Sequence, residues 1–506
     1  MDLAIIVIYL AAMVAFGWWG KSRTKDSSDF LVAGRRLGPV LYTGTLSALV
    51  LGGASTVGGV ALGYEFGLSG AWLVAAIALG VLALSLFFAG KIQRLRIFTV
   101  AQMLALRYGV GATAASGVVM VAYTLMLAVT STMAYATVFN VLFGTDRVVS
   151  VLIGGVIVVI YSTIGGMWSI TLTDMVQFVL QTVGIFVLLL PFTWNHAGGL
   201  DGIRARASDS VFELGAIGTG TIITYVVVYT FGMLIGQDIW QRVFTARSPQ
   251  VARWGGTAAG VYCLLYGVAG ALIGTAASTF VTVEDRNDVY ATIAESILPV
   301  GVTGLVLAAA VAAMMSTASG ALIATATVAR ADVQPLLARL IGRAPERVQD
   351  EAENPEHDML ANRIYVVAIG IVVVIIASLL SDVVSALTIA YDILVGGLLV
   401  PILGGFLWRR ATGAAAVAAM AAGTAATLAT MAIVGDVLAN EPVYVGLAVS
   451  AVAYIVVSLL TRPTDPGVMR EWTSRLAGEV SFDATGDADA PSVSAAEPTS
   501  GRRQAP

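Results

Sequence analysis

The sequence has little charge and almost no cysteine or histidine. Only 12% of its 506 residues are charged, whereas 58% are hydrophobic. A single cysteine, Cys263, excludes a disulfide framework, and neither His196 nor His357 has the spacing of a metal site. Glycine pairs occur in apolar runs and lack the Lys-Ser/Thr ending of a phosphate-binding loop. An ATP-driven pump is therefore disfavoured, and we expect no enzyme.

The sequence contains many long runs of uncharged, mostly apolar residues. A chain with a mean hydropathy of +0.86 cannot bury its apolar surface in one soluble core. We therefore predict an all-α polytopic membrane protein. Its thirteen transmembrane helices are expected near 3–20, 38–64, 69–90, 112–143, 148–166, 169–193, 217–237, 252–281, 299–329, 361–381, 384–408, 411–434 and 441–461.

The basic residues predict the orientation. If the N-terminus lies outside, 24 of the 28 Lys and Arg residues fall on the cytoplasmic side. Residues 1–461 would form a transmembrane domain of the plasma membrane, and 462–506 a mostly disordered cytoplasmic tail. Helices two to six and seven to eleven form two blocks of five, about 38–193 and 217–408. Because five is odd, the blocks would have opposite orientations, as inverted repeats of secondary transporters do.

The second span carries two glycine pairs, Gly52-Gly53 and Gly58-Gly59. Each glycine costs about 1 kcal/mol of helix stability relative to alanine, so this span is predisposed to unwind. Carbonyls freed by unwinding can hold a small cation at membrane depth. The alternative is close packing of helices, which glycine also allows.

Hydroxyls crowd one turn of the ninth span, at Ser316, Thr317 and Ser319. Hydroxyl and carbonyl oxygens suit a weakly held monovalent cation, whereas divalent ions recruit carboxylates. Alternatively, the hydroxyls only bond back to the preceding turn.

Acidic and polar residues in other spans leave two interpretations open. Asp174 is either functional or an N-terminal acid favoured by the helix dipole. Asp392 must face protein or water. Polar groups on the fourth and seventh spans, among them Ser131 and Gln237, either orient a solute or form interhelical hydrogen bonds.

Six segments together resemble the sodium:solute symporter family. They are DFLVAGRRLGPV (29–40), GGASTVGGVALGYEFGLSG (52–70), IGGMWSITLTDMVQ (164–177), GQDIWQRVFTARS (236–248), AAMMSTASGALI (312–323) and PILGGFLWRRATGAAA (401–416). The resemblance implies a leucine-transporter-like core of two inverted five-helix repeats.

The resemblance also implies a set of site residues. Sodium, the co-transported ion, would be bound by the carbonyls of Ala48, Leu51 and Ala313 and the hydroxyls of Ser316 and Thr317. A second ion would use Asp174 and Ser319, although Gly320 replaces a hydroxyl found in some members. The solute candidates are Gly52, Ser55, Thr56, Ser131 and Gln237. No Lys or Arg is expected at midplane depth.

The expected function is sodium-coupled symport of a small polar or organic solute into the cell. The partners would be the solute, sodium and the lipid bilayer, with no nucleic acid and no obligatory protein partner. One alternative is proton coupling, for which Asp174 is the candidate group. Another is a sensor that uses the transporter fold without net transport. A channel is disfavoured because no ring of charges or filter-like carbonyl run is present.

Overall fold

The protein is helical throughout the part that the structure describes. The computed structural model describes residues 1–109, 111–341, 355–380, 383–436 and 439–480. Within these ranges the β contacts are limited to one isolated parallel bridge, between Leu37 and Ala246. The predicted all-α class is therefore confirmed for the described residues.

The helices of the first half alternate long membrane-length elements with short connecting ones. They are α1 (Asp2–Lys21), α2 (Ser27–Val32), α3 (Pro39–Val50), α4 (Gly53–Phe66), α5 (Trp72–Ala83), α6 (Gly90–Arg94), α7 (Val100–Tyr108), α8 (Gly111–Phe143), α9 (Arg147–Thr182), α10 (Leu190–His196) and α11 (Gly199–Arg206).

The second half continues in the same way. Its helices are α12 (Thr219–Tyr225), α13 (Phe231–Ile235), α14 (Gln237–Thr245), α15 (Gly256–Ala277), α16 (Val289–Ile297), α17 (Val302–Val328), α18 (Gln334–Leu340), α19 (Pro355–Leu379), α20 (Val383–Leu407), α21 (Gly413–Val434), α22 (Glu441–Leu460) and α23 (Pro466–Ala477).

Short turns of other helical types join or continue these helices. The 3₁₀ turns are η1 (Ala33–Arg35), η2 (Gly67–Ala71), η5 (Asp209–Phe212) and η8 (Arg286–Asp288). The π-helical turns are η3 (Leu84–Ala89), η4 (Val183–Leu189), η6 (Val226–Thr230), η7 (Val251–Gly255) and η9 (Ala329–Val333).

Among the described residues, ten helices are long and apolar enough to cross a membrane, or eleven with the bent pair at Gly236. The predicted count of thirteen is not confirmed by this number. Two of the ten, Gly53–Arg94 and Arg147–His196, contain 42 and 50 residues. Since about 20 residues cross a bilayer, each is long enough for two crossings. Each also turns at a glycine with positive φ, Gly67 (62°) and Gly166 (54°). The count of thirteen and the inverted repeat stay predictions.

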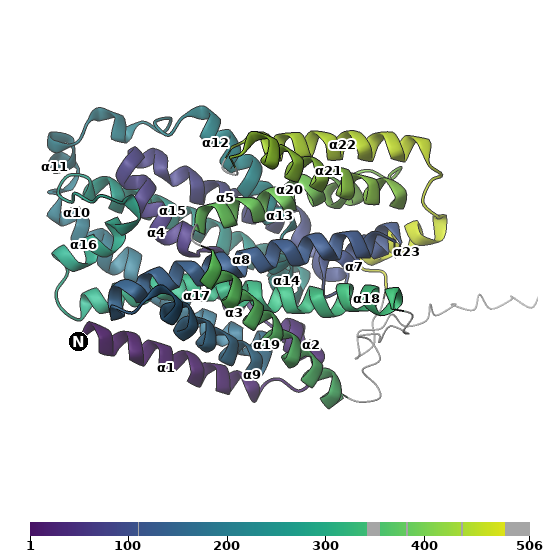
Figure 1. Cartoon of the computed structure of the whole chain (residues 1–506), viewed down its shortest axis with the longest axis horizontal. Helices are drawn as coiled ribbons and strands as arrows, with labels where there is room; N and C mark the ends of the chain where they lie inside the picture. Colours follow the sequence, from purple (N-terminus) through teal and green to yellow (C-terminus); the bar gives the residue numbers. More distant parts are fainter. Residues whose placement is uncertain (110, 342–354, 381–382, 437–438, 481–506) are drawn as a thin grey trace, which may run out of the picture.

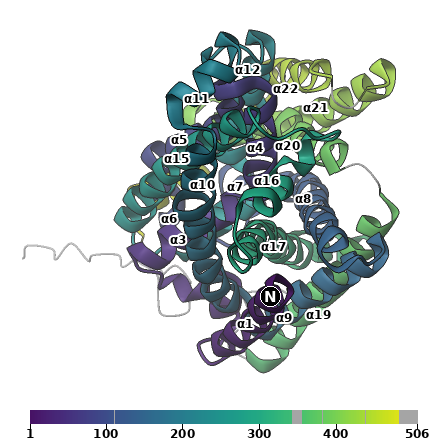
Figure 2. The ribbon, with the colours of Figure 1, turned by 90° about the vertical axis from the view of Figure 1, so that its left-hand side faces the viewer.

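Helix α17 is the central element of the molecule. All of its residues except Val302 and Leu305 are buried, and Figure 2 shows it in the middle of the end-on view, with α1, α8, α9 and α19 around it. A helix that is apolar on all sides has no face suited to water and becomes a core helix. Its many Ala, Gly and Ser residues let neighbouring backbones approach closely.

The second predicted span consists of two helices, α3 and α4, that meet at Leu51 and Gly52. Unwinding is thus confirmed at the first glycine pair but was wrong for the second, because Gly58 and Gly59 remain helical within α4. Close packing explains Gly63, farther along α4, but not Gly58, whose Cβ would have only the carbonyl oxygen of Gly53 within reach, at 3.9 Å. A Cβ on Gly63 would come 2.5 Å from the carbonyl oxygen of Ala271 on α15. The first glycine pair therefore marks the break, and close packing is evident at Gly63 and not at the second pair.

Figure 1 shows the N-terminus, α11 and α16 toward one end of the molecule and α18 and α23 toward the other. The buried side chain of Trp472 holds α23 against the protein. Arg94 Nη1 donates to the carbonyls of Leu476 and Ala477, both at 3.1 Å, and so satisfies the C-terminal end of α23. The beginning of the predicted disordered tail is therefore an ordered helix. Residues 481–506, on which the rest of that prediction falls, lie outside the described residues.

Candidate sodium and solute site

The site begins at the interruption between α3 and α4. Leu51 has φ −91° and ψ 65°, and Gly52 is extended with φ −77° and ψ −162°. The last carbonyls of a helix have no partner within that helix. At the end of α3 these carbonyls include those of Ala48 and Leu49, and both face the protein interior.

Two hydroxyls of α17 meet these carbonyls. Ser316 Oγ lies 2.7 Å from the carbonyl oxygen of Ala48 and 2.8 Å from that of Ala313. Thr317 Oγ1 lies 2.8 Å from the carbonyl oxygen of Leu49 and 3.4 Å from that of Ala313. We refer to these two hydroxyls and three carbonyls as the oxygen cluster. It joins a broken helix to an unbroken one.

The chemistry of the oxygen cluster matches a monovalent cation. All five oxygens are formally neutral, and each hydroxyl has one hydrogen to donate but two lone pairs to offer. A cation that enters the cluster replaces the O–H···O=C hydrogen bonds: the hydroxyl hydrogens turn away, and both oxygens of each pair face the ion. Among the described residues no group of three or more His, Cys, Asp or Glu could hold a metal ion. Nothing in that part of the chain therefore provides the carboxylate cage that a divalent ion prefers.

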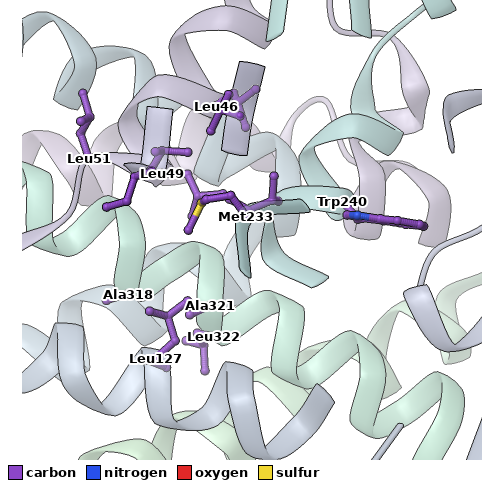
Figure 3. Packing of buried hydrophobic residues seen from close by; sticks show 14 of the residues in the cluster. Leu46, Leu49, Leu51, Leu127, Met233, Trp240, Ala318, Ala321 and Leu322 are labelled. Atoms are coloured by element: carbon purple, nitrogen blue, oxygen red, sulfur yellow. The ribbon is translucent and has the colours of Figure 1, made fainter. Parts of the chain in front are cut away.

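Gly52 lies directly against the oxygen cluster. A Cβ at this position would stand 2.6 Å from Thr317 Oγ1 and 3.2 Å from Thr317 Cβ. Only a residue without a side chain allows this approach. Figure 3 shows the apolar packing nearby, with Leu49 and Leu51 at the end of α3 and Ala318 on α17. The sequence did not single out the Leu49 carbonyl, while a ligand role for Leu51 stays a prediction.

Three of the five solute candidates gather where α4 begins. Gly52 precedes the helix, Ser55 Oγ reaches back to the carbonyl of Val50 at 3.4 Å, and Thr56 Oγ1 hydrogen bonds with Tyr266 Oη at 3.0 Å. Helix α8 passes close to them, since a Cβ on Gly53 would lie 3.2 Å from Ala134 Cβ. Ser131 is buried one turn earlier on α8.

The fifth candidate, Gln237, has a different environment. Its Oε1 accepts from the backbone N–H of Val100 at 2.7 Å, and its Nε2 donates to the carbonyl of Phe98 at 3.0 Å. Both ends of the amide are thus used to hold the chain that leads into α7. These contacts favour a structural role for Gln237 over contact with a solute.

Asp174 is fully buried on α9 and forms an ion pair that the sequence did not suggest. Arg242 Nη2 lies 3.0 Å from Asp174 Oδ2, which also accepts a hydrogen bond from Thr45 Oγ1. Arg242 is thus a buried basic residue within the helical core, which was not expected from the sequence. Arg242 packs against α17, where a Cβ on Gly320 would lie 3.2 Å from Arg242 Nη2.

Local structure explains why both charges are buried. All nine residues of α14 are buried, so Arg242 cannot reach water from this helix. Asp174 does not open a helix either, because α9 runs from Arg147 and its only non-helical residues are Gly165 and Gly166, two turns earlier. The N-terminal-acid interpretation is therefore wrong.

Ser319, the other residue predicted for a second ion, makes a hydrogen bond within its own helix. Its Oγ donates to the carbonyl of Ser316 at 3.1 Å.

Comparison with known proteins gives the family. The model of the sodium:solute symporter family matches residues 30–423, well over half of the chain. The chain belongs to the sodium:solute symporter family. The resemblance seen in the six sequence segments is thereby confirmed.

Relatives and solved structures agree with this assignment. The symporter is 24% identical to the high-affinity choline transporter 1 of Caenorhabditis elegans, with 74% of this chain and 68% of the relative covered. It is 26% identical to the osmoregulated proline transporter OpuE of Bacillus subtilis, with 66% of this chain and 71% of the relative covered. A Na⁺-coupled sialic acid symporter shares the fold, with a TM-score of 0.79 at 19% identity and 92% and 98% of the two chains covered.

The family and these relatives are transporters. The protein is a membrane protein that performs sodium-coupled symport of a small solute.

Proposed function

We propose that the oxygen cluster binds the co-transported sodium ion, and that the solute binds beside it at Gly52, Ser55 and Thr56. One observation carries this proposal: the hydroxyls of Ser316 and Thr317 on an unbroken helix lie 2.7 and 2.8 Å from carbonyls freed at the break of another. In this proposal the N-terminus is outside, and sodium and solute move together into the cell down the inward sodium gradient.

Sodium binding would be coupled to the relative position of two helices. The ligands come from both α3 and α17, so a bound ion favours the arrangement in which these helices are close. A ligand shifts a conformational equilibrium only by its differential affinity for the two states. Separation of α3 from α17 would lower the sodium affinity and release the ion. Inward movement of one charge contributes about 2.3 kcal/mol for each 100 mV of membrane potential.

The solute would be recognised by hydroxyls and by the start of α4. The first N–H groups of a helix have no partner within it and carry partial positive charge. Helix α4 begins at Gly53, directly beside Gly52. We infer a small solute with at least one acceptor group, such as a carboxylate. The relative OpuE is named for proline, which carries a carboxylate; the C. elegans relative is named for choline, whose one acceptor is a hydroxyl.

Uptake into proteoliposomes tests the coupling. Labelled proline, choline and short monocarboxylates would be presented with an inward sodium gradient, and sodium would be replaced by potassium, since choline is in the panel. We expect accumulation of at least one solute only with sodium. Accumulation that is unchanged in potassium would overturn sodium coupling. Accumulation driven by a proton gradient alone would instead support the proton-coupled alternative.

Two substitutions test the site itself. Ser316→Ala and Thr317→Val each remove one oxygen from the oxygen cluster. A hydrogen bond to a charged group contributes about 1.5–3 kcal/mol, so the sodium concentration for half-maximal uptake should rise roughly 10- to 100-fold. Thr325→Val is the matched control, because Thr325 is fully buried on the same helix and donates only to the carbonyl of Ala321, at 2.7 Å. If both test variants keep the wild-type sodium dependence, these hydroxyls do not bind sodium.

A further inference from the structure

Asp392 is a buried carboxylate that has no counterion in the described part of the chain. It lies in the apolar span Leu387–Leu407 of α20, more than two helical turns from either end of that helix. The residue is 1% exposed, and its Oδ2 has no hydrogen-bond partner among the described residues. The ion pairs of these residues do not include Asp392. Because an acid at this depth is costly unless a cation neutralises it, its partner is to be sought outside the chain.

Four tyrosine rings form an array beside this carboxylate. Tyr391, the residue before Asp392, stands edge-to-face with Tyr123 of α8 and Tyr229 of η6, with ring centroids 5.5 and 5.3 Å apart. Tyr225 of α12 continues the array in the same geometry, 5.7 Å from Tyr229. The charge of Asp392 lies within electrostatic reach of the Tyr229 hydroxyl. We refer to these four side chains as the tyrosine array.

A carboxylate beside aromatic rings suits an organic cation. The face of an aromatic ring attracts an ammonium group within about 6 Å of its centroid. A hard metal cation prefers a cage of several oxygens, which ring faces do not provide. Tyr225 and Tyr229 are only half-buried, so part of each ring is accessible to a ligand. The chemistry of the array and of Asp392 together therefore favours a positively charged nitrogen.

Helix α4 connects the tyrosine array to the proposed solute site. Leu62 on this helix belongs to a buried apolar cluster against which Tyr225 and Tyr229 pack. Ser55 lies seven residues earlier on the same face of α4, about 10 Å along the helix. In the proposed orientation α4 runs outward from Gly53, so the array lies on the outer side of Ser55. Figure 1 shows α12 and α13 beside α20, with η6 between the first two.

We propose that Asp392 and the tyrosine array bind a positively charged nitrogen of the solute, so that the symporter carries zwitterionic or cationic amines. The inference rests on the proposed function, in which an acceptor group of the solute binds at the start of α4, and it names the chemical class of that solute. The cation meets the accessible rings first and reaches the carboxylate as neighbouring side chains adjust, which is common on binding. A solute without this charge would leave the buried carboxylate unpaired, and such a site rejects it.

Matched probes test the charge requirement in the wild type. Labelled proline, choline and short monocarboxylates are presented to proteoliposomes with an inward sodium gradient. Two unlabelled competitors lack the positive nitrogen: the ring-oxygen analogue of proline and the carbon isostere of choline. We expect sodium-dependent uptake only of proline or choline. Each isostere should compete roughly 10- to 100-fold more weakly than the solute it imitates, because it leaves the carboxylate unpaired.

Substitutions test the residues themselves at saturating sodium. Asp392→Asn keeps the size of the side chain and removes its charge, so the half-saturating concentration of the charged solute should rise roughly 10- to 100-fold and approach that of its isostere. Asp332→Asn is the matched control. Asp332 is also buried with an unpartnered Oδ2, but it lies in η9 and accepts from Thr99 Oγ1 at 3.1 Å. This control should keep the preference for the charged solute.

Tyr229 separates the contribution of a ring from that of a hydroxyl. Tyr229→Leu removes the ring and should weaken solute affinity roughly 3- to 30-fold, whereas Tyr229→Phe keeps the ring face and should change the affinity much less. Equal losses in the two variants would mean that the ring face does not bind the cation.

Each remaining outcome also decides. Monocarboxylate uptake as efficient as that of proline or choline in the wild type would overturn the charge requirement and leave the sodium site standing, whether or not any variant folds. An unchanged half-saturating concentration in Asp392→Asn would overturn the role of this carboxylate. So would a loss that is equal for the charged solute and its isostere. A wild type without sodium-dependent uptake of any probe would instead refute the proposed function.

Discussion

The contact between Gly52 and Thr317 gives a sharp test of the proposed sodium site. Gly52→Ala adds a single methyl group, 2.6 Å from Thr317 Oγ1 and 3.2 Å from Thr317 Cβ. The backbone itself would not resist the change, since Gly52 has φ −77° and ψ −162°, a conformation open to alanine. Any effect must therefore come from the contact with Thr317.

The expected loss of sodium affinity follows from how far the added methyl group displaces the Thr317 hydroxyl. Ordinary carbon–oxygen contacts begin near 3.4 Å, so the Thr317 hydroxyl must move by close to 1 Å. Its hydrogen bond to the Leu49 carbonyl is now 2.8 Å long, and such a shift would break it. Loss of one oxygen that faces an ion is worth about 1.5–3 kcal/mol, which is roughly a 10- to 100-fold weaker sodium affinity.

The assay is the initial rate of solute uptake as a function of sodium concentration. The matched control is Gly58→Ala, on the same helix, where the nearest atom to a new Cβ is the carbonyl oxygen of Gly53 at 3.9 Å. This control should keep the wild-type sodium dependence and stabilise α4 by up to about 1 kcal/mol. The double variant Gly52→Ala/Thr317→Ala should be no worse than Thr317→Ala alone, because both changes remove the same hydroxyl.

Two results would contradict this reasoning. Gly52→Ala with normal uptake and wild-type sodium dependence would mean that Thr317 does not bind sodium at the break. An equal loss in Gly52→Ala and Gly58→Ala would mean that α4 tolerates no added methyl group, whatever its neighbour.

Two further substitutions test helix packing away from the oxygen cluster, at α23 and at Gly166. Trp472→Ala should release α23, because this buried side chain packs on Phe406 with 5.4 Å between ring centroids and its loss costs about 3–5 kcal/mol. Trypsin should then cleave at Arg470 and Arg475 faster than in the wild type, and equal cleavage rates would show that Trp472 does not hold α23. Gly166→Ala should lower the thermal unfolding temperature in detergent, since Gly166 has φ 54° and its Cβ would collide with the backbone of Phe30. Gly215→Ala, with no atom within 4 Å and no positive φ, is the control, and an equal shift in both variants would argue against local strain at Gly166.

The parts of the site that depend on local chemistry were predictable from the sequence. Glycines interrupt an apolar run at Gly52, and hydroxyls crowd an otherwise apolar helix at Ser316 and Thr317. The structure places these features together, with hydrogen bonds of 2.7 and 2.8 Å to carbonyls of α3. The alternative in which the hydroxyls only bond back to their own helix is incomplete, since both also bond to α3.

The parts that depend on long-range packing were not predictable. In sequence Arg242 ends the segment QDIWQR, in which four of six residues are polar, as is typical of a helix end near water. Its burial follows from the 44° bend at Gly236, which separates α13 from a fully buried α14. Gln237 was a solute candidate because it is a polar group on an apolar span, but its amide binds the backbone of Phe98 and Val100, more than a hundred residues away in sequence.

Leu49 lies between the oxygen cluster and the ion pair of Asp174 and Arg242. Its carbonyl accepts the hydrogen bond of Thr317, and its side chain packs into the space that Gly320 leaves beside Arg242. Two glycines therefore have complementary effects on the same stretch of α17: Gly52 admits the Thr317 hydroxyl, and Gly320 admits both Leu49 and the guanidinium group. A movement of α3 that draws Leu49 away from α17 would loosen the oxygen cluster and the packing around Arg242 together.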